Sequence, residues 1–151
     1  EDAIRNASSA PQIAFCALVV DVNSLKAVND HFGHEAGDAV IVHVARVLKA
    51  CLRREDILAR SGGDEFIVLC ANTQPEGAEE LADRIHRRLA RQPVARFRNA
   101  APDGDHYATV AIGIACSREV APDRVLAVAD ARMYDAKERY YANADSGTSN
   151  T

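Results

Sequence analysis

The stretch IAFCALVV, residues 13–20, is a continuous run of apolar residues that ends abruptly at Asp21. A short apolar run without alternation is typical of a strand that is buried on both faces at the centre of a sheet. Because a carboxylate follows the run directly, the strand would present an acidic group at the point where the buried core ends. The sequence therefore predicts a central strand that delivers Asp21 to a polar site.

The rest of the chain supplies helix and strand patterns that would surround this strand. We expect helices over about 24–31, 35–52, 75–90 and 122–140, strands over 57–60, 65–70 and 107–116, and a short edge strand over 93–98. Residues 1–12 are expected to be the remnant of a leading helix, and residues 143–151 a polar, disordered tail after one domain over 1–142. The order β-α-α-β-β-α-(β)-β-α predicts an α/β (α+β) fold with one mixed, mostly antiparallel sheet flanked by helices.

Composition narrows the class of protein. The chain has 151 residues, of which 48% are hydrophobic and 26% charged, as in a single globular domain. A formal net charge of −4 and 5% aromatic residues argue against binding a nucleic acid polymer. The longest apolar run is too short for a membrane span and no secretory signal opens the chain, so we expect a cytoplasmic domain. The scattered spacing of the four cysteines predicts buried free thiols rather than disulfides or a zinc site.

Two strand-like segments, 57–60 and 65–70, flank the tetrapeptide Ser61-Gly62-Gly63-Asp64, which predicts a tight hairpin. If this hairpin pairs beside the central strand, Asp64 comes close to Asp21, and two carboxylates form an oxygen-rich site suited to Mg²⁺. Gly62 and Gly63 have no side chains, so a bulky phosphate group could approach their backbone closely. The tetrapeptide alone fits a plain polar hairpin tip equally well.

The longer run RSGGDEF, residues 60–66, resembles the defining motif of the GGDEF family, the diguanylate cyclases. Three further segments resemble the family in the same order: DVNSLKAVNDHFGHEAGD (21–38), TVAIGIA (109–115) and ADARMYDAK (129–137). The resemblance implies a palm fold like that of the adenylyl cyclase core. It also implies an enzyme that condenses two GTP into cyclic di-GMP and two pyrophosphates in a homodimer, because each chain would hold one GTP.

The resemblance assigns metal binding and catalysis to residues at the two carboxylate positions. Asp21 and Asp64, assisted by the backbone carbonyl of Val22, would bind Mg²⁺ or Mn²⁺. Glu65 would help to deprotonate the attacking 3′-hydroxyl of GTP.

Five more residues would bind the substrate under the same resemblance. Lys26 and Lys137 would bind phosphates, although each lysine taken alone fits a solvated surface charge. Asn29 and Asp38 would recognise guanine, because a carboxylate accepts hydrogen bonds that adenine cannot donate. His34 would support the substrate loop.

The segment Arg53 to Asp56 precedes the two glycines in the register of the family's RxxD site, where cyclic di-GMP inhibits the enzyme. Arginine forks suit phosphates and guanine edges, and Arg84 on the following helix would add a contact. Without its register, RxxD would also fit a charge cluster at a helix end.

The sequence departs from the family at three places. Asn23 stands where many members have a second Asp, and Tyr140-Tyr141 replaces a Gly-Arg pair, which predicts weaker binding of the triphosphate. An N-terminal family segment is absent, which suggests that the chain is a fragment of a parent protein with an upstream sensory or dimerising region. This parent protein could be anchored in a membrane. A module that senses GTP or cyclic di-GMP without turnover therefore remains an alternative, as does a cyclase for another nucleotide, which Asn29 and Asp38 disfavour.

Overall fold

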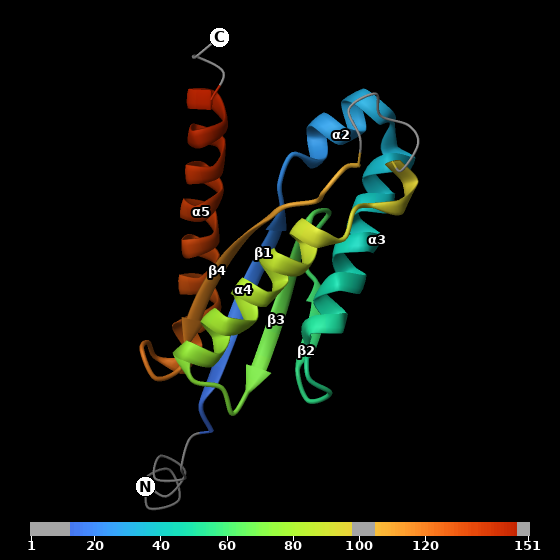
Figure 1. The fold of residues 1–151 in the computed structure, drawn as a ribbon. Helices are drawn as coiled ribbons and strands as arrows, with labels where there is room; N and C mark the ends of the chain where they lie inside the picture. The colour runs from blue at the N-terminus through green and yellow to red at the C-terminus, as the bar shows by residue number, and fades with distance from the viewer. Residues whose placement is uncertain (1–12, 98–104, 148–151) are drawn as a thin grey trace, which may run out of the picture.

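The computed structural model describes residues 13–97 and 105–147, which form one four-stranded sheet with helices on both faces (Figure 1). The elements in chain order are β1 (Phe15–Val22), α2 (Leu25–Phe32), α3 (His34–Cys51), β2 (Ile57–Arg60), β3 (Glu65–Ala71), α4 (Pro75–Arg91), η1 (Ala95–Phe97), β4 (Val110–Cys116), η2 (Pro122–Arg124) and α5 (Val125–Gly147). The strand order is β2-β3-β1-β4, and every pairing among these strands is antiparallel. The predicted fold class is confirmed.

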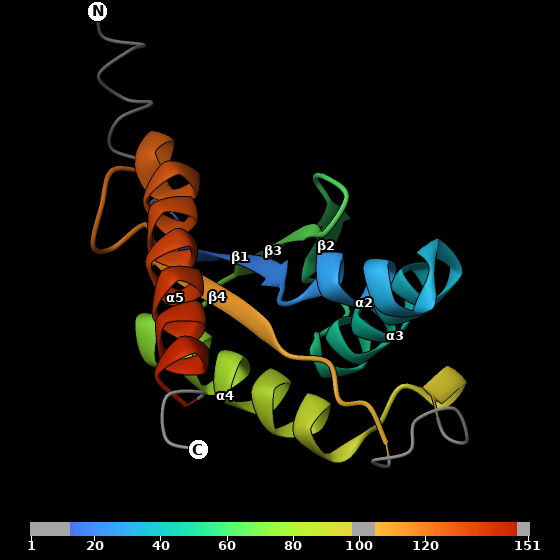
Figure 2. The same cartoon turned by 90° about the horizontal axis from the view of Figure 1, so that it is seen from above.

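Strand β1 occupies the interior of the sheet, and its alternating side chains supply two separate cores. Leu18 and Val20 face the layer that contains α3 and α4, whereas Ala17 and Val19 face α5. Figure 2 shows α5 on one side of the sheet and α4 on the other. Because helices cover both faces of the sheet, the side chains on both faces of β1 have to be apolar, which explains the unbroken apolar run.

Helix α5 packs unusually close to strand β4 at Gly113. A Cβ at this position would overlap the carbonyl oxygen of Ala129 and the backbone nitrogen of Met133. Only glycine allows the two backbones to approach this closely. Lys137 follows Met133 by one helical turn, so this contact also sets the position from which Lys137 reaches the end of the sheet.

The predicted edge strand over 93–98 is wrong, because the described part of this segment contains the 3₁₀ turn η1. Val94 and Phe97 are both buried in the larger core, and a strand would place residues three apart on opposite faces. A 3₁₀ turn brings residues i and i+3 to the same side, which allows both side chains to be buried.

Helix α5 extends beyond its predicted end near residue 140 and finishes at Gly147. The part of the predicted tail over 143–147 is therefore helical, and its small polar residues do not interrupt the helix. The proposed leading helix over 1–12 and residues 148–151 lie outside the described residues. No helix in the described ranges combines the length and the apolar character needed to cross a bilayer.

The expectation of four free thiols is wrong for one pair of cysteines. Cys16 and Cys116 are opposite each other in the register of β1 with β4, and they form a disulfide across 100 residues of sequence. Cys51 and Cys70 are buried and free. Spacing along the chain could not indicate this pair, because only the strand order shows that the two cysteines are neighbours.

Candidate active site

The hairpin between β2 and β3 lies beside the end of β1, as the sequence predicts. Asp21 is opposite Glu65 in the register, and the backbone nitrogen of Val22 donates to the carbonyl of Asp64 at 2.9 Å. Residues directly opposite in an antiparallel pair share a face, so Glu65 lies with Asp21 on the face covered by α5. The end of the central strand therefore gathers three carboxylate residues from two elements.

Lys137 brings a positive charge from α5 to these carboxylates. Its Nζ lies 2.6 Å from Asp21 Oδ1 and 3.9 Å from Asp64 Oδ2. Asp21 is only 6% exposed, so its carboxylate has lost most of its contact with water. The ammonium group of Lys137 supplies the counter-charge that this loss requires.

Burial has opposite effects on the two partners of this ion pair. Desolvation raises the pKa of Asp21, the hydrogen bond from Lys137 lowers it, and the charge of Asp64 raises it further, which leaves it above the ordinary value. Desolvation lowers the pKa of Lys137, but the hydrogen bond and charge of Asp21 and the charge of Asp64 raise it above its ordinary value. Lys137 therefore stays charged at neutral pH, and the crowded carboxylates favour a bound cation.

The carboxylates of Asp21 and Asp64 suit a hard divalent cation whose remaining ligands are oxygens of the substrate. Within the described ranges, no group of three or more His, Cys, Asp or Glu side chains could hold a metal ion. Asp21 and Asp64 nevertheless converge on one positive charge, and Mg²⁺ is commonly held by one or two carboxylates together with substrate phosphates. The residues therefore fit Mg²⁺ or Mn²⁺ bound together with a phosphate ligand.

The glycine hairpin is held by a residue that the sequence argument missed. Arg60 donates from Nε to the carbonyl of Gly62 at 3.0 Å and from Nη2 to the carbonyl of Gly63 at 2.6 Å. The Ser61 hydroxyl donates to Glu65 Oε1 at 3.1 Å. A Cβ at Gly63 would meet no described atom within 4 Å, so the space beside this glycine is open to a bulky group. The arginine that opens the RSGGDEF run was the available signal.

The residues expected to recognise guanine are brought together only in part. The side-chain oxygen of Asn29 is buried without a hydrogen-bond partner in the described structure, and it occupies the space that a Cβ on Gly37 would need. Gly37 therefore lets Asn29 pack against α3 beside Asp38. Asp38 itself lines a pocket of about 310 Å³ that Asn29 does not line. His34 and Lys26 are exposed in the first turns of α3 and α2.

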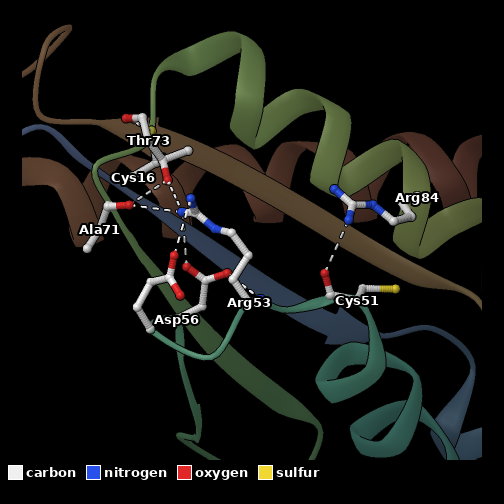
Figure 3. A network of polar contacts seen from close by, with 8 residues as sticks. Cys16, Cys51, Arg53, Asp56, Ala71, Thr73 and Arg84 are labelled. Carbon is white, nitrogen blue, oxygen red and sulfur yellow. Dashed lines mark hydrogen bonds and ion pairs between the residues drawn. The ribbon is translucent and has the colours of Figure 1, made fainter.

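Arg53 and Asp56 form a local network beside Ala71, at the end of β3 opposite to the glycine hairpin. Figure 3 shows this network. Arg53 Nη2 donates to the carbonyl of Ala71 at 2.9 Å and to Thr73 Oγ1 at 2.8 Å, and it lies 3.3 Å from Asp56 Oδ1. Asp56 Oδ2 also accepts from the backbone nitrogen of Arg53 at 2.8 Å. The carboxylate thus fixes both the turn and the guanidinium.

Arg84 approaches the same region from α4, where its Nη1 donates to the carbonyl of Cys51 at 3.5 Å (Figure 3). Arg53, Asp56 and Arg84 line one pocket of about 340 Å³. The structure thus brings together the three residues that the sequence analysis grouped as an inhibitory site.

Tyr140 and Tyr141 contact the turn that follows β1. The Tyr141 hydroxyl accepts from the backbone nitrogen of Ser24 at 2.9 Å, and the Tyr140 hydroxyl lies 3.4 Å from Ser24 Oγ. Ser24 has φ of 60°, a left-handed conformation that costs a non-glycine residue about 1 kcal/mol or more. The two tyrosine contacts offset part of this conformational free energy and join α5 to the turn. The sequence pattern did not indicate this role.

The family model described as "Diguanylate cyclase, GGDEF domain" matches residues 1–142 of the chain. The chain belongs to the GGDEF family. The probable diguanylate cyclase DgcT of Escherichia coli is 35% identical over 133 residues, which cover 87% of this chain and 29% of DgcT. The cyclic di-GMP phosphodiesterase PdeR of E. coli is 40% identical over 123 residues, which cover 80% of this chain and 18% of PdeR.

A solved GGDEF domain, that of YfiN (TpbB) from Pseudomonas aeruginosa, superposes with a TM-score of 0.76 at 36% identity and covers 91% of this chain and 84% of that chain. The chain spans less than a third of each of the two E. coli relatives. One of these carries the name of a cyclase and the other that of a phosphodiesterase, so the activity of this GGDEF domain has to be argued from its own site.

Proposed function

We propose that this GGDEF domain, residues 1–142, is a diguanylate cyclase that condenses two GTP into cyclic di-GMP and two pyrophosphates. The observation that carries the proposal is the convergence of Asp21, Asp64 and Lys137 at the end of β1, beside an intact Gly-Gly-Asp-Glu-Phe hairpin. A pair of carboxylates with a resident positive charge suits a reaction in which negative charge builds on a phosphorus centre.

The side chains divide the work of binding and proton transfer. Asp21, Asp64 and the carbonyl of Val22 would hold Mg²⁺ or Mn²⁺, which when bound neutralises the triphosphate and the charge that builds on the α-phosphorus. Glu65, held by the Ser61 hydroxyl, would accept the proton of the 3′-hydroxyl.

The remaining residues would orient GTP. Lys26 and Lys137 would donate to its phosphates, which could pass close to Gly62 and Gly63 because the hairpin is open there. Asn29 and Asp38 would bind the edge of guanine, and His34 would support the loop between them. The buried, unpartnered oxygen of Asn29 supports a role in binding a polar ligand.

Each chain would hold one GTP, so the reaction needs two chains whose sites face each other. We propose a homodimer, formed in the cytoplasm and promoted by an upstream sensory or dimerising region of a longer parent protein. Cyclic di-GMP would bind to Arg53, Asp56 and Arg84 and inhibit the enzyme. These three residues share a pocket that lies outside the carboxylate cluster, which consists of Asp21, Asp64 and Glu65.

A sensor that binds GTP or cyclic di-GMP without turnover is the second candidate. The observation that favours it concerns Tyr140 and Tyr141, which replace the family's Gly-Arg pair on α5. Their hydroxyls contact Ser24 in the turn after β1, so these positions offer no arginine to a phosphate.

One incubation separates these candidates: the protein with GTP and Mg²⁺, followed by chromatographic separation of the nucleotides. We expect cyclic di-GMP from the wild type and from the control Asp123→Asn, an exposed aspartate in η2, and none from Asp64→Asn. Tight GTP binding without product, in a full-length dimeric protein, would favour the sensor and refute the cyclase.

A further inference from the structure

The charges of helix α4 fall into two blocks of opposite sign. The helix carries four acids followed by four arginines: Glu76, Glu79, Glu80 and Asp83, then Arg84, Arg87, Arg88 and Arg91. Seven of these eight residues are exposed and Arg88 is half-buried, whereas the opposite side of the helix is buried in the core. Figure 2 shows α4 on the outside of the sheet, with its outer side free of the other labelled elements.

The two blocks mirror each other about the midpoint between Asp83 and Arg84. Every acid has an arginine at the same distance on the other side: Glu76 with Arg91, Glu79 with Arg88, Glu80 with Arg87, and Asp83 with Arg84. A two-fold axis that crosses the helix at this midpoint places each acid at the level of an arginine of an antiparallel copy. This is the self-complementarity that an isologous interface requires.

Helical periodicity brings six of the eight charges onto one stripe. Positions 76, 80, 83, 84, 87 and 91 follow the spacing of a single helix face, and Glu79 and Arg88 flank this stripe on either side. We propose that this α4 stripe is the docking surface for a second copy of the chain, with the two α4 helices antiparallel. Three pairs, each formed twice by symmetry, then connect the copies.

Charges within the same chain do not account for the pattern. In the described part of the chain, none of the six stripe residues forms an ion pair within 4.0 Å. The helix dipole favours Glu76 in the first turn and Arg91 in the last, but its effect is small beyond the terminal turns. Among the described residues, it therefore leaves Glu80, Asp83 and Arg87 without an ion pair within 4.0 Å, while Arg84 donates to the carbonyl of Cys51.

The association is independent of the proposed cyclase dimer. Helix α4 covers the face of the sheet opposite to α5, which carries Lys137, so an α4 dimer leaves the carboxylate cluster uncovered. A single helix from each copy buries less surface than a stable interface usually needs, and its attraction is electrostatic. The dimer should therefore be weak and should dissociate as salt rises, because the Debye length falls to about 3 Å at 1 M.

Sedimentation velocity of the 151-residue chain over a range of concentrations tests the proposal. At low salt we expect concentration-dependent dimers, with a dissociation constant that rises at least about tenfold in 0.5 M NaCl. Glu76→Arg with Glu80→Arg should abolish the dimer, and so should Arg87→Glu with Arg91→Glu, because each variant places like charges opposite each other. Mixing the two variants should restore association, since the altered blocks are complementary in the heterodimer.

Two further variants guard against trivial results. Arg118→Glu with Arg124→Glu lowers the net charge by the same amount as Arg87→Glu with Arg91→Glu, at exposed positions outside α4, and should leave the dimer intact. The milder pair Glu80→Gln with Arg87→Gln should weaken the dimer even where the reversed helix is too unstable to fold, which circular dichroism checks. A monomeric wild type, reversed variants that dimerise normally, or a mixture that stays monomeric would each overturn the proposal. A dimer that forms only after cyclic di-GMP is added would do the same, because binding of that ligand at Arg53, Asp56 and Arg84 belongs to the proposed function and not to the α4 charges.

Discussion

The carboxylate cluster and the Arg53 pocket both pair an acid with a base, but the fold builds them in different ways. Lys137 and Asp21 are 116 residues apart in sequence and meet only because α5 lies against the sheet, and Asp21 is almost completely buried. Arg53 and Asp56 lie within one turn of chain, and the Arg53 side chain is 49% exposed. The comparison suggests that the first site depends on the whole fold, whereas the second needs one turn and the neighbouring strand end.

The largest difference should appear in turnover. Asp21→Asn should reduce the initial rate of cyclic di-GMP formation at least about a hundredfold, because it removes a charge from the cluster where the reaction develops charge. Arg53→Ala should keep the initial rate and lose inhibition by added cyclic di-GMP. Nucleotide chromatography at saturating GTP measures both effects. An Asp21→Asn protein with the wild-type rate, or an Arg53→Ala protein that is still inhibited, would contradict the division of roles.

Stability should separate the two sites next. Lys137→Met leaves the buried carboxylate of Asp21 without its counter-charge and should lower the free energy of unfolding by about 1–3 kcal/mol. Arg53→Met removes a side chain that is 49% exposed from an Asp56 side chain that is 3% exposed. Asp56 still accepts from the backbone nitrogen of residue 53, so the loss should be smaller, about 1 kcal/mol. Urea unfolding at neutral pH measures both values, and an equal loss in the two variants would show that burial does not distinguish the sites.

The buried aspartate also predicts a pH dependence. Because the pKa of Asp21 is raised above 3.8, the folded protein holds this proton more readily than the unfolded chain. The stability that this group contributes is therefore present at low pH and is lost as pH rises through its folded pKa. Asp21→Asn does not titrate, so its stability relative to wild type should increase as the pH rises from the ordinary aspartate pKa through the raised pKa of Asp21. Urea unfolding at a series of pH values checks the sign, and a flat or falling difference would be inconsistent with it.

The smallest effect should come from the edge of the cluster, where Tyr141 is 40% exposed. Tyr141→Phe removes the acceptor for the backbone nitrogen of Ser24 and should lower the free energy of unfolding by about 0.5–1.5 kcal/mol. Tyr134→Phe is the matched control, because Tyr134 is exposed and its hydroxyl has no hydrogen bond in the described structure. If thermal unfolding shows equal shifts for both variants, the Ser24 contact does not hold α5 to the turn.

Local patterns predicted most of the fold and half of the cluster. The apolar run ending at Asp21 and the glycine hairpin before Glu65 are both local, and pairing the two strands was enough to bring Asp64 beside Asp21. The contact of Lys137 with Asp21 was not predictable from spacing, since it depends on the position of α5 over the sheet. The same limit applies to the disulfide between Cys16 and Cys116, which only strand order makes possible.

The segment after α4 shows a different kind of error. Residues 93–98 have strand-like composition, but burying Val94 and Phe97 together required a turn instead. Arg60 was overlooked because a charged residue at a strand end is usually solvated, and its two bonds to glycine carbonyls exist only when the hairpin is formed.

The contact at Gly113 gives the TVAIGIA motif a role at a distance from any substrate. A methyl group there would push α5 away from the sheet, and Lys137, one turn beyond the contact, would move with it. The absence of a side chain at Gly113 therefore sets the distance between α5 and the sheet, and with it the distance from the Lys137 ammonium group to the carboxylates of Asp21 and Asp64. A larger residue at position 113 would therefore change the affinity of the protein for cations and phosphates, although residue 113 itself would contact neither.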